Sequence, residues 1–142
     1  MPNPAALVPG VLEGLTALEA AVAAAGIDGR LLALSRLRAS QINGCGPDVV
    51  AAARRARGQG VTGDQVDSVA AWRETPWFNA EERAALALAE AVTRVADRDD
   101  PVPDRVWDVA ATHLDQKELA VLLVGIALTN LHNRLSTSTR QK

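Results

Sequence analysis

A chain of 142 residues is long enough to bury a sizeable core, and we expect residues 1–142 to form a single domain. Hydrophobic residues make up 48% of the chain and aromatic residues only 3%, so the core has to be built from Ala, Leu and Val, which suits close-packed helices. The formal net charge of -2 does not favour nucleic acid as a partner, and the single cysteine excludes an internal disulfide and a cysteine-rich zinc site.

The first two predicted helices are marked by their ends. Residues 11–25 are rich in Ala and Leu and are followed by Gly26, a residue that often terminates a helix. Asp28 can cap a second helix, which runs out near Gly44.

Start signals then predict a third and a fourth helix. Pro47 is expected as the first residue of the third helix, because its missing N–H costs nothing there; this helix stops near residues 58–60. Thr62 and Gln65 have the spacing of a capping box and predict a short helix that reaches Trp72.

Three more helices complete the chain. Asn79 with Glu82 starts the fifth, residues 104–111 form the sixth, and Asp115 with Glu118 starts the last. No segment alternates with the period of a strand. We therefore expect an all-α fold of about six or seven helices.

The sequence shows no targeting or membrane-spanning segment. Its first residues lack the basic and apolar segments of a signal peptide. The apolar run at residues 119–128 is shorter than the about 20 residues that span a bilayer. We expect a cytoplasmic protein that does not enter a membrane.

Cys45 is the first candidate for chemistry, since it precedes a predicted helix N-terminus, which favours a thiolate. Asp48 lies three residues on and nearly on the same face, where its carboxylate favours the neutral thiol. The alternative is that Cys45 is a small buried hydrophobic residue. His113 and His132 have no metal-ligand spacing, and no phosphate-binding loop is present, so we expect neither a metal nor a cofactor.

Most of the aromatic side chains are close together in the sequence: Trp72, Trp77 and Phe78 fall within seven positions. Aromatic residues bury large areas both in cores and in interfaces. The cluster is therefore either a core anchor or a contact in an oligomer.

Three stretches resemble the alkylhydroperoxidase D-like branch of the carboxymuconolactone decarboxylase family. The signature stretch is LRASQINGC at residues 37–45. AWRETPWF at residues 71–78, followed by EERAALA at 81–87, is similar to the middle block. IALTNLHNR at residues 126–134 is similar to the C-terminal block, with His132 where many relatives carry tryptophan. The resemblance implies an all-helical alkylhydroperoxidase D-like bundle that assembles as a trimer or hexamer.

The resemblance also implies a reaction that this chain has lost. Peroxidases of the family carry a glutamate, a Cys-x-x-Cys motif and a histidine; the second cysteine attacks peroxide, the first resolves the sulfenic acid, and the other two relay protons. The glutamate, second-cysteine and histidine positions correspond to Ala33, Asp48 and Ala52, and only Cys45 is kept. Alanine transfers no proton and aspartate cannot form a sulfenic acid, so we interpret the site as degenerate.

Three functions follow from this interpretation. The first is a non-catalytic homo-oligomer that binds a small molecule or a protein. The second is a peroxidase or reductase that uses Cys45 with an external resolving thiol. The third is a decarboxylase-type or lactone-processing enzyme, whose acid, base and cationic groups would come from the set Arg36, Arg38, Arg73, His113, His132 and Arg134. Within this set Arg38, His132 and Arg134 are the expected pocket residues, although Arg38 and Arg134 are also explained as structural residues that satisfy carboxylates and helix carbonyls.

Overall fold

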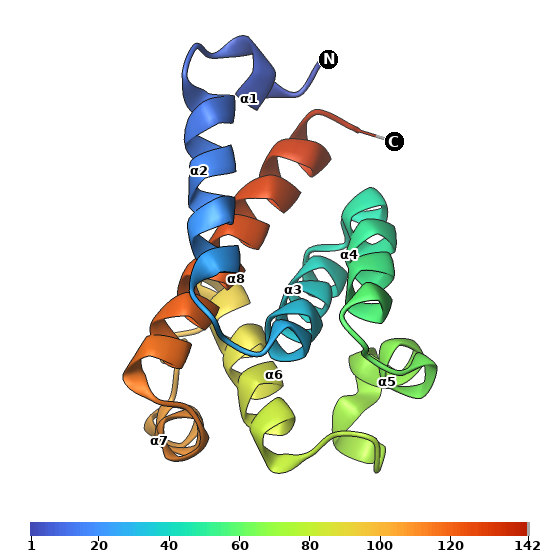
Figure 1. Cartoon of the computed structure of the whole chain (residues 1–142), viewed down its shortest axis with the longest axis vertical. Coiled ribbons are helices and arrows are strands. Elements are labelled where there is room, and N and C mark those ends of the chain that lie inside the picture. Colours follow the sequence, from blue (N-terminus) through green and yellow to red (C-terminus); the bar gives the residue numbers. More distant parts are fainter. Residues whose placement is uncertain (142) are drawn as a thin grey trace.

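The structure is a computed structural model that describes residues 1–141, and in this range all of its regular secondary structure is helical. Figure 1 shows the helices in chain order: α1 (Pro4–Leu7), α2 (Val11–Ala24), α3 (Gly29–Asn43), α4 (Gly46–Gly58), α5 (Gly63–Ser68), η1 (Val69–Glu74), α6 (Ala80–Thr93), η2 (Val95–Asp97), α7 (Asp104–His113) and α8 (Gln116–Ser138). The all-α prediction is confirmed. The described residues hold eight α-helices rather than six or seven, because Asn3 caps an additional short helix, α1.

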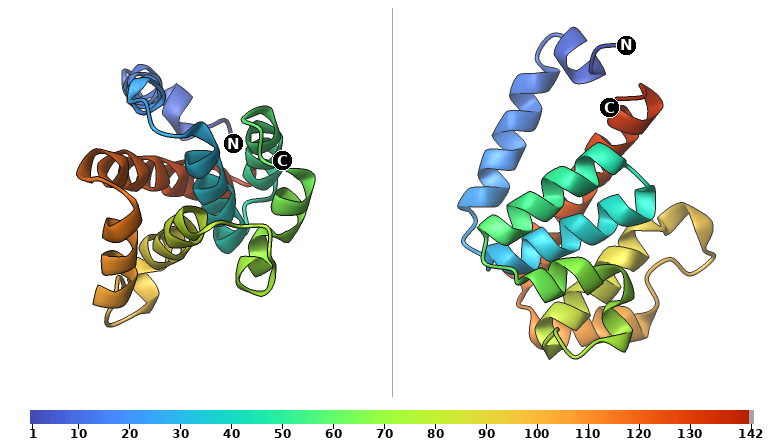
Figure 2. Two further views of the ribbon diagram at one scale, coloured as in Figure 1. Left: turned by 60° about the horizontal axis from the view of Figure 1, so that its bottom comes forward. Right: turned by 90° about the vertical axis from the view of Figure 1, so that its right-hand side faces the viewer.

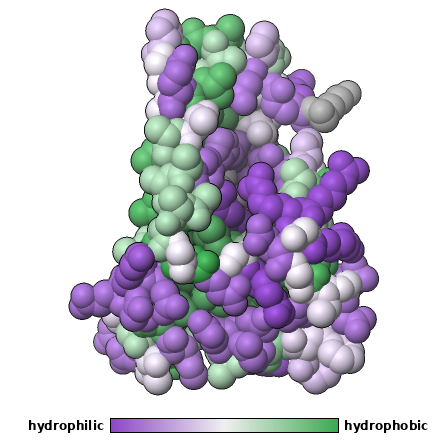
Figure 3. Space-filling view, viewed as in Figure 1, coloured by the Kyte–Doolittle hydropathy of each residue, from purple (hydrophilic) through white to green (hydrophobic). Residues whose placement is uncertain are grey.

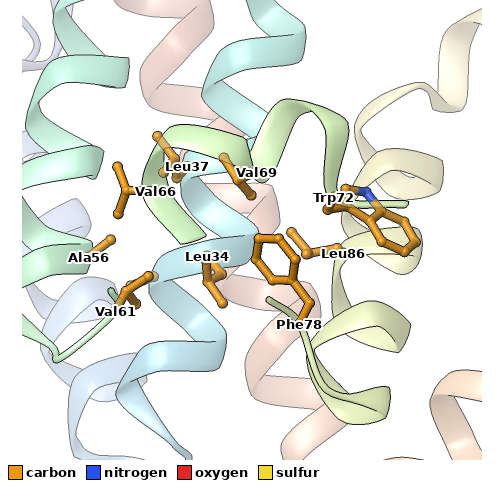
Figure 4. Packing of buried hydrophobic residues seen from close by; sticks show 10 residues of the cluster. Leu34, Leu37, Ala56, Val61, Val66, Val69, Trp72, Phe78 and Leu86 are labelled. Atoms are coloured by element: carbon orange, nitrogen blue, oxygen red, sulfur yellow. The ribbon is translucent and has the colours of Figure 1, made fainter. Parts of the chain in front are cut away.

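α3 is the central helix and packs against α4, α6 and α8 (Figure 2). On one side it shares a hydrophobic cluster with α4, α5, η1 and α6, which Figure 4 shows around Leu34, Val69 and Leu86. On the other side a second cluster joins α3 and α6 to α7 and α8. α1 and α2 are held on α8 by a third, smaller cluster of Ala5, Leu15, Val22 and Leu128.

Most of the helix starts that the sequence predicts from capping residues are confirmed. Capping boxes start α5 at Thr62, α6 at Asn79 and α8 at Asp115, each with both reciprocal hydrogen bonds present. The Asp28 carboxylate accepts the backbone N–H of Arg30 at 2.9 Å at the start of α3.

Two boundaries differ from the prediction. The helix predicted from Thr62 to Trp72 ends at Ser68, whose own backbone leaves α-helical geometry (φ -107°, ψ 1°), and it continues as the 3₁₀ helix η1, which is kinked at Ala71 (φ -118°, ψ 32°). Pro47 occupies the second helical position of α4 rather than the first, since the helix starts one residue earlier and Cys45 is its N-cap.

The structure distinguishes between a core role and an interface role for the three clustered aromatic residues. Trp72 and Phe78 are buried in the cluster of Figure 4 and act as core anchors, whereas Trp77 is 50% exposed. An interface role is therefore available only to Trp77.

α8 is the longest helix, and over an 18-residue window its mean hydropathy is 1.3. By length and composition alone it could cross a membrane, but core helices pass the same test. In the fold it packs against α3, α6, α2 and α7, and 44% of that window is buried. This property is therefore weak ground for a membrane span.

Candidate functional site

The three positions interpreted from the sequence as replaced catalytic positions line one cavity. Ala33 on α3 and both Asp48 and Ala52 on α4 face a space of about 780 Å³ that is bounded by α2, α3, α4 and α8. We call this space the Asp48 cavity. Figure 3 shows a recess at this place between the α2 side and the α4 side of the molecule. Ala33 is at the same time 4% exposed and part of the first hydrophobic cluster, against which Ala52 packs, so these positions lie where the cavity meets the core.

Cys45 lies beneath the wall of this cavity and is only 3% exposed. Its thiol donates a hydrogen bond to Asp48 Oδ2 over 3.0 Å, as the three-residue spacing predicts. A thiolate at this position would face the carboxylate as a like charge. In this arrangement the Cys45 thiol is the hydrogen-bond donor and the Asp48 carboxylate is the acceptor.

A buried amide from α8 holds Asp48 in place. Asn133 is 1% exposed and donates to Asp48 Oδ2 at 2.7 Å and to the Ser40 hydroxyl at 3.2 Å. Its own oxygen accepts the Asn43 amide at 2.9 Å. These hydrogen bonds join α3, α4 and α8 at the floor of the site.

A second carboxylate on the cavity wall is that of Glu19 on α2, and Arg36 on α3 binds it. Arg36 is 7% exposed and donates two parallel hydrogen bonds to the Glu19 carboxylate, at 3.2 and 2.8 Å. His132 Nε2 lies 3.3 Å from the same carboxylate. All of these residues line the Asp48 cavity, which therefore contains an oriented carboxylate, an imidazole and a guanidinium.

Glu19 stays ionised in this setting. Burial raises the pKa of its carboxyl, but the hydrogen bonds and the charge of Arg36 outweigh burial. The nearby positive charges of His132 and Arg55 act in the same direction, so the Glu19 pKa lies below its ordinary value of 4.5.

The structure separates the three residues expected to share a pocket. His132 lines the Asp48 cavity. Arg38 lines a different cavity, where its Nε donates to Glu90 at 2.9 Å. Arg134 donates to the backbone and side-chain oxygens of Asn130 on its own helix and lines neither of the two cavities.

The remaining candidate residues for acid–base chemistry, Arg36, Arg73 and His113, also lie at different places in the fold. Arg36 joins His132 at the Asp48 cavity, whereas Arg73 pairs with Glu90 at 2.7 Å beside Arg38. His113 is exposed in the last turn of α7. Within residues 1–141, no group of three or more His, Cys, Asp or Glu side chains is placed to hold a metal ion.

The sequence interpretation missed Glu19 and Asn133. A signal for Asn133 was present, because the buried stripe of α8 continues from Ile126 through Asn130 to Asn133 at helical spacing. Polar residues on such a stripe have to find buried partners, so the stripe indicates a hydrogen-bond network. Glu19 gives no such signal, since its role depends on how α2 packs.

The sequence model of the carboxymuconolactone decarboxylase family matches residues 9–91. The uncharacterized protein YdfG of Bacillus subtilis is 32% identical over 103 residues, which is 72% of this chain and 69% of YdfG. The uncharacterized protein YnjA of Escherichia coli is 36% identical over 75 residues, which is 53% of this chain and 40% of YnjA. The chain belongs to the carboxymuconolactone decarboxylase family.

Two solved structures share the fold. A protein of unknown function from Agrobacterium tumefaciens, provisionally named the antioxidant defence protein AhpD, superposes with a TM-score of 0.91 at 31% identity, over 99% of this chain and 94% of that one. The debrominase Bmp8 without ligand superposes with a TM-score of 0.82 at 20% identity, over 94% of this chain and 71% of that one. The first likeness supports the alkylhydroperoxidase D-like fold predicted from the sequence, and the second shows the fold alone.

Proposed function

We propose that this chain is a non-catalytic, small-molecule-binding member of the carboxymuconolactone decarboxylase family that reduces hydroperoxides neither with two thiols nor with one. The observation that supports this proposal is the Asp48 cavity itself, because all three replaced positions line it. Its volume of about 780 Å³ falls within the range of about 300–1,000 Å³ typical of ligand pockets.

The chemistry of the site argues against a dithiol cycle. Such a cycle reduces the O–O bond of a hydroperoxide to an alcohol and water while two thiols become a disulfide. Here Cys45 carries the only thiol, this thiol is buried, and Asp48 stands where the attacking thiol would be. Ala33 and Ala52 supply no proton relay.

Hydroperoxide consumption with dithiothreitol as electron donor tests the proposed lack of peroxidase activity. The wild type and a Cys45→Ser variant should both stay at the uncatalysed rate. Consumption that Cys45→Ser abolishes would establish a one-cysteine peroxidase with an external resolving thiol. Consumption that survives Cys45→Ser would show that other residues carry the reaction; both results contradict the proposal.

A restored variant serves as the positive control. Ala33→Glu, Asp48→Cys and Ala52→His together return the family's groups to positions that already border the cavity. We expect this triple variant to consume hydroperoxide in a manner that depends on Cys45. Such a gain would tie the missing activity to these three positions.

Binding of the dye 1-anilinonaphthalene-8-sulfonate, an apolar anion of suitable size, tests whether the Asp48 cavity binds a small molecule. An Ala52→Leu variant narrows the Asp48 cavity, whereas Ala111→Leu places the same added volume on the exposed face of α7. We expect saturable 1:1 binding that Ala52→Leu weakens and Ala111→Leu leaves unchanged. Equal binding by both variants would refute the assignment of the cavity as the binding site.

The pair formed by Glu19 and His132 favours a second candidate, a cofactor-free acid–base enzyme. A carboxylate that orients a histidine beside a ligand is a common arrangement for general acid–base catalysis, and Arg36 keeps this carboxylate ionised. Screening lactones and unsaturated carboxylic acids for turnover by NMR tests this candidate. Turnover that His132→Gln abolishes would replace the binding function by this one.

We also propose a homo-oligomer, a trimer or a hexamer. Apolar residues remain exposed along α2, where Leu12 is 52% and Leu18 48% exposed. Figure 3 shows hydrophobic surface over the α2 side of the molecule. On α8, Val124 is 44% and Leu131 39% exposed. Light scattering coupled to size exclusion should give a mass above that of one chain, and Leu18→Glu should lower it.

A further inference from the structure

A second cavity, of about 520 Å³, lies away from the family site, between α3, η1, α6 and α7. Five arginines and two glutamates line it, which gives a formal charge of +3 on a chain whose net charge is -2: Arg38, Arg73, Arg94, Arg98, Arg105, Glu74 and Glu90. We call it the arginine cavity. It shares no lining residue with the Asp48 cavity.

One carboxylate organises one side of this cavity. Glu90 accepts hydrogen bonds from Arg38 Nε at 2.9 Å, Arg73 Nη1 at 2.7 Å and Trp72 Nε1 at 3.0 Å. The Arg73 guanidinium also lies 4.1 Å from the centre of the Trp72 ring. A single negative charge thus positions two guanidinium groups, each of which keeps further N–H donors.

The other side of the cavity has positive charge without a matching carboxylate. Within residues 1–141, Arg94, Arg98 and Arg105 lie more than 4.0 Å from every carboxylate oxygen. Arg98 and Arg105 are exposed at the rim of the cavity, and the acidic residues beside them in sequence, Asp97, Asp99, Asp100 and Asp104, are exposed and do not line it. The positive charge on this side is therefore left for an external anion.

We infer that the arginine cavity binds a small molecule that carries a phosphate or diphosphate group. Guanidinium groups recognise phosphate oxygens through paired N–H donors. A planar carboxylate occupies one such fork, whereas a tetrahedral phosphate accepts from several directions, which suits arginines that come from α3, η1, the C-cap of α6, the loop before α7 and α7 itself. The volume leaves room for an organic group beside the phosphate. This inference is independent of the function proposed for the Asp48 cavity.

Titration calorimetry with inorganic pyrophosphate at low ionic strength tests it. We expect saturable binding by the wild type and a loss of at least about tenfold in affinity in the double variant Arg98→Gln/Arg105→Gln. The control Arg54→Gln/Arg140→Gln removes the same charge from exposed sites outside the cavity and should change the affinity less than twofold. An equal loss in both double variants, or no saturable binding by the wild type, would overturn the inference.

A variant of opposite sign tests the same point without weakening the fold. Glu74 is exposed, lines the cavity and makes no ion pair in the described residues, so Glu74→Gln raises the formal charge of the lining to +4. Pyrophosphate should then bind more tightly. If the wild type binds no pyrophosphate and Arg98→Gln/Arg105→Gln lowers the oligomeric mass, the arginines belong to a contact between chains and the inference is wrong.

Discussion

Replacing Asn133 by alanine tests whether the amide on α8 holds the family site together. The substitution removes one hydrogen bond to the charged Asp48, worth about 1.5–3 kcal/mol, and two neutral ones to Ser40 and Asn43, worth about 1 kcal/mol each. Alanine recovers about 0.5 kcal/mol through its higher helix propensity. Water from the adjacent Asp48 cavity satisfies part of what is left. We therefore expect a loss of about 2–3 kcal/mol in the free energy of unfolding.

Urea unfolding followed by circular dichroism measures this loss. Thr137→Ala is the matched control, because Thr137 is exposed on the same helix and should stay within about 0.5 kcal/mol of the wild type. In a double-mutant cycle with Asp48→Ala, the two substitutions should couple by about 1 kcal/mol or more. A stability of Asn133→Ala equal to that of the control would refute the reasoning, since helix propensity alone predicts a gain.

Three further predictions concern other parts of the molecule. Burial raises the Glu90 pKa, but hydrogen bonds from arginine and tryptophan side chains hold this pKa below the ordinary 4.5. The ionised carboxylate therefore stabilises the fold above about pH 4.5, and this contribution is lost as the pH falls through the lowered pKa. In acid titrations, the stability difference between the wild type and Glu90→Gln should shrink below pH 4.5. Cys45 should react with iodoacetamide at pH 7 more slowly than free cysteine and faster after Asp48→Ala, as mass spectrometry would show. Gly125→Ala should stabilise the chain in thermal unfolding by less than the about 1 kcal/mol that alanine usually brings to a helix, because the new Cβ would lie 2.5 Å from Leu32 Cδ1 and the end of this half-buried side chain has to move.

Features of the fold that depend on neighbours in sequence could be predicted from the sequence. The capping boxes at Thr62, Asn79 and Asp115 use residues three positions apart, so their geometry is fixed by the chain itself. The change from α5 to η1 was not predictable in this way. It places Trp72 in the core and its Nε1 on Glu90, and both contacts are tertiary.

In the candidate site, too, contacts between sequence neighbours could be predicted, whereas contacts between distant helices could not. The contact between Cys45 and Asp48 follows from helical spacing and was predicted. The pairing of Glu19 with Arg36 joins residues 17 positions apart on different helices, and no local pattern indicates it. Arg38 was grouped with His132 although the fold places them at separate cavities, because sequence spacing does not tell which side of α3 a neighbouring helix will cover.

The attachment of α2 has a consequence for how a molecule would reach the Asp48 cavity. α2 forms one wall of that cavity, and the smallest of the three apolar clusters, reinforced by the salt bridge from Arg36 to Glu19, fastens it to the remaining helices. Segments with few apolar contacts open locally more often than the rest of a fold. Backbone amides of α2 should therefore exchange with deuterated solvent before those of α3, and occupancy of the cavity should slow that exchange. A guest molecule that contacts α2 would therefore stabilise the most weakly attached wall of the cavity.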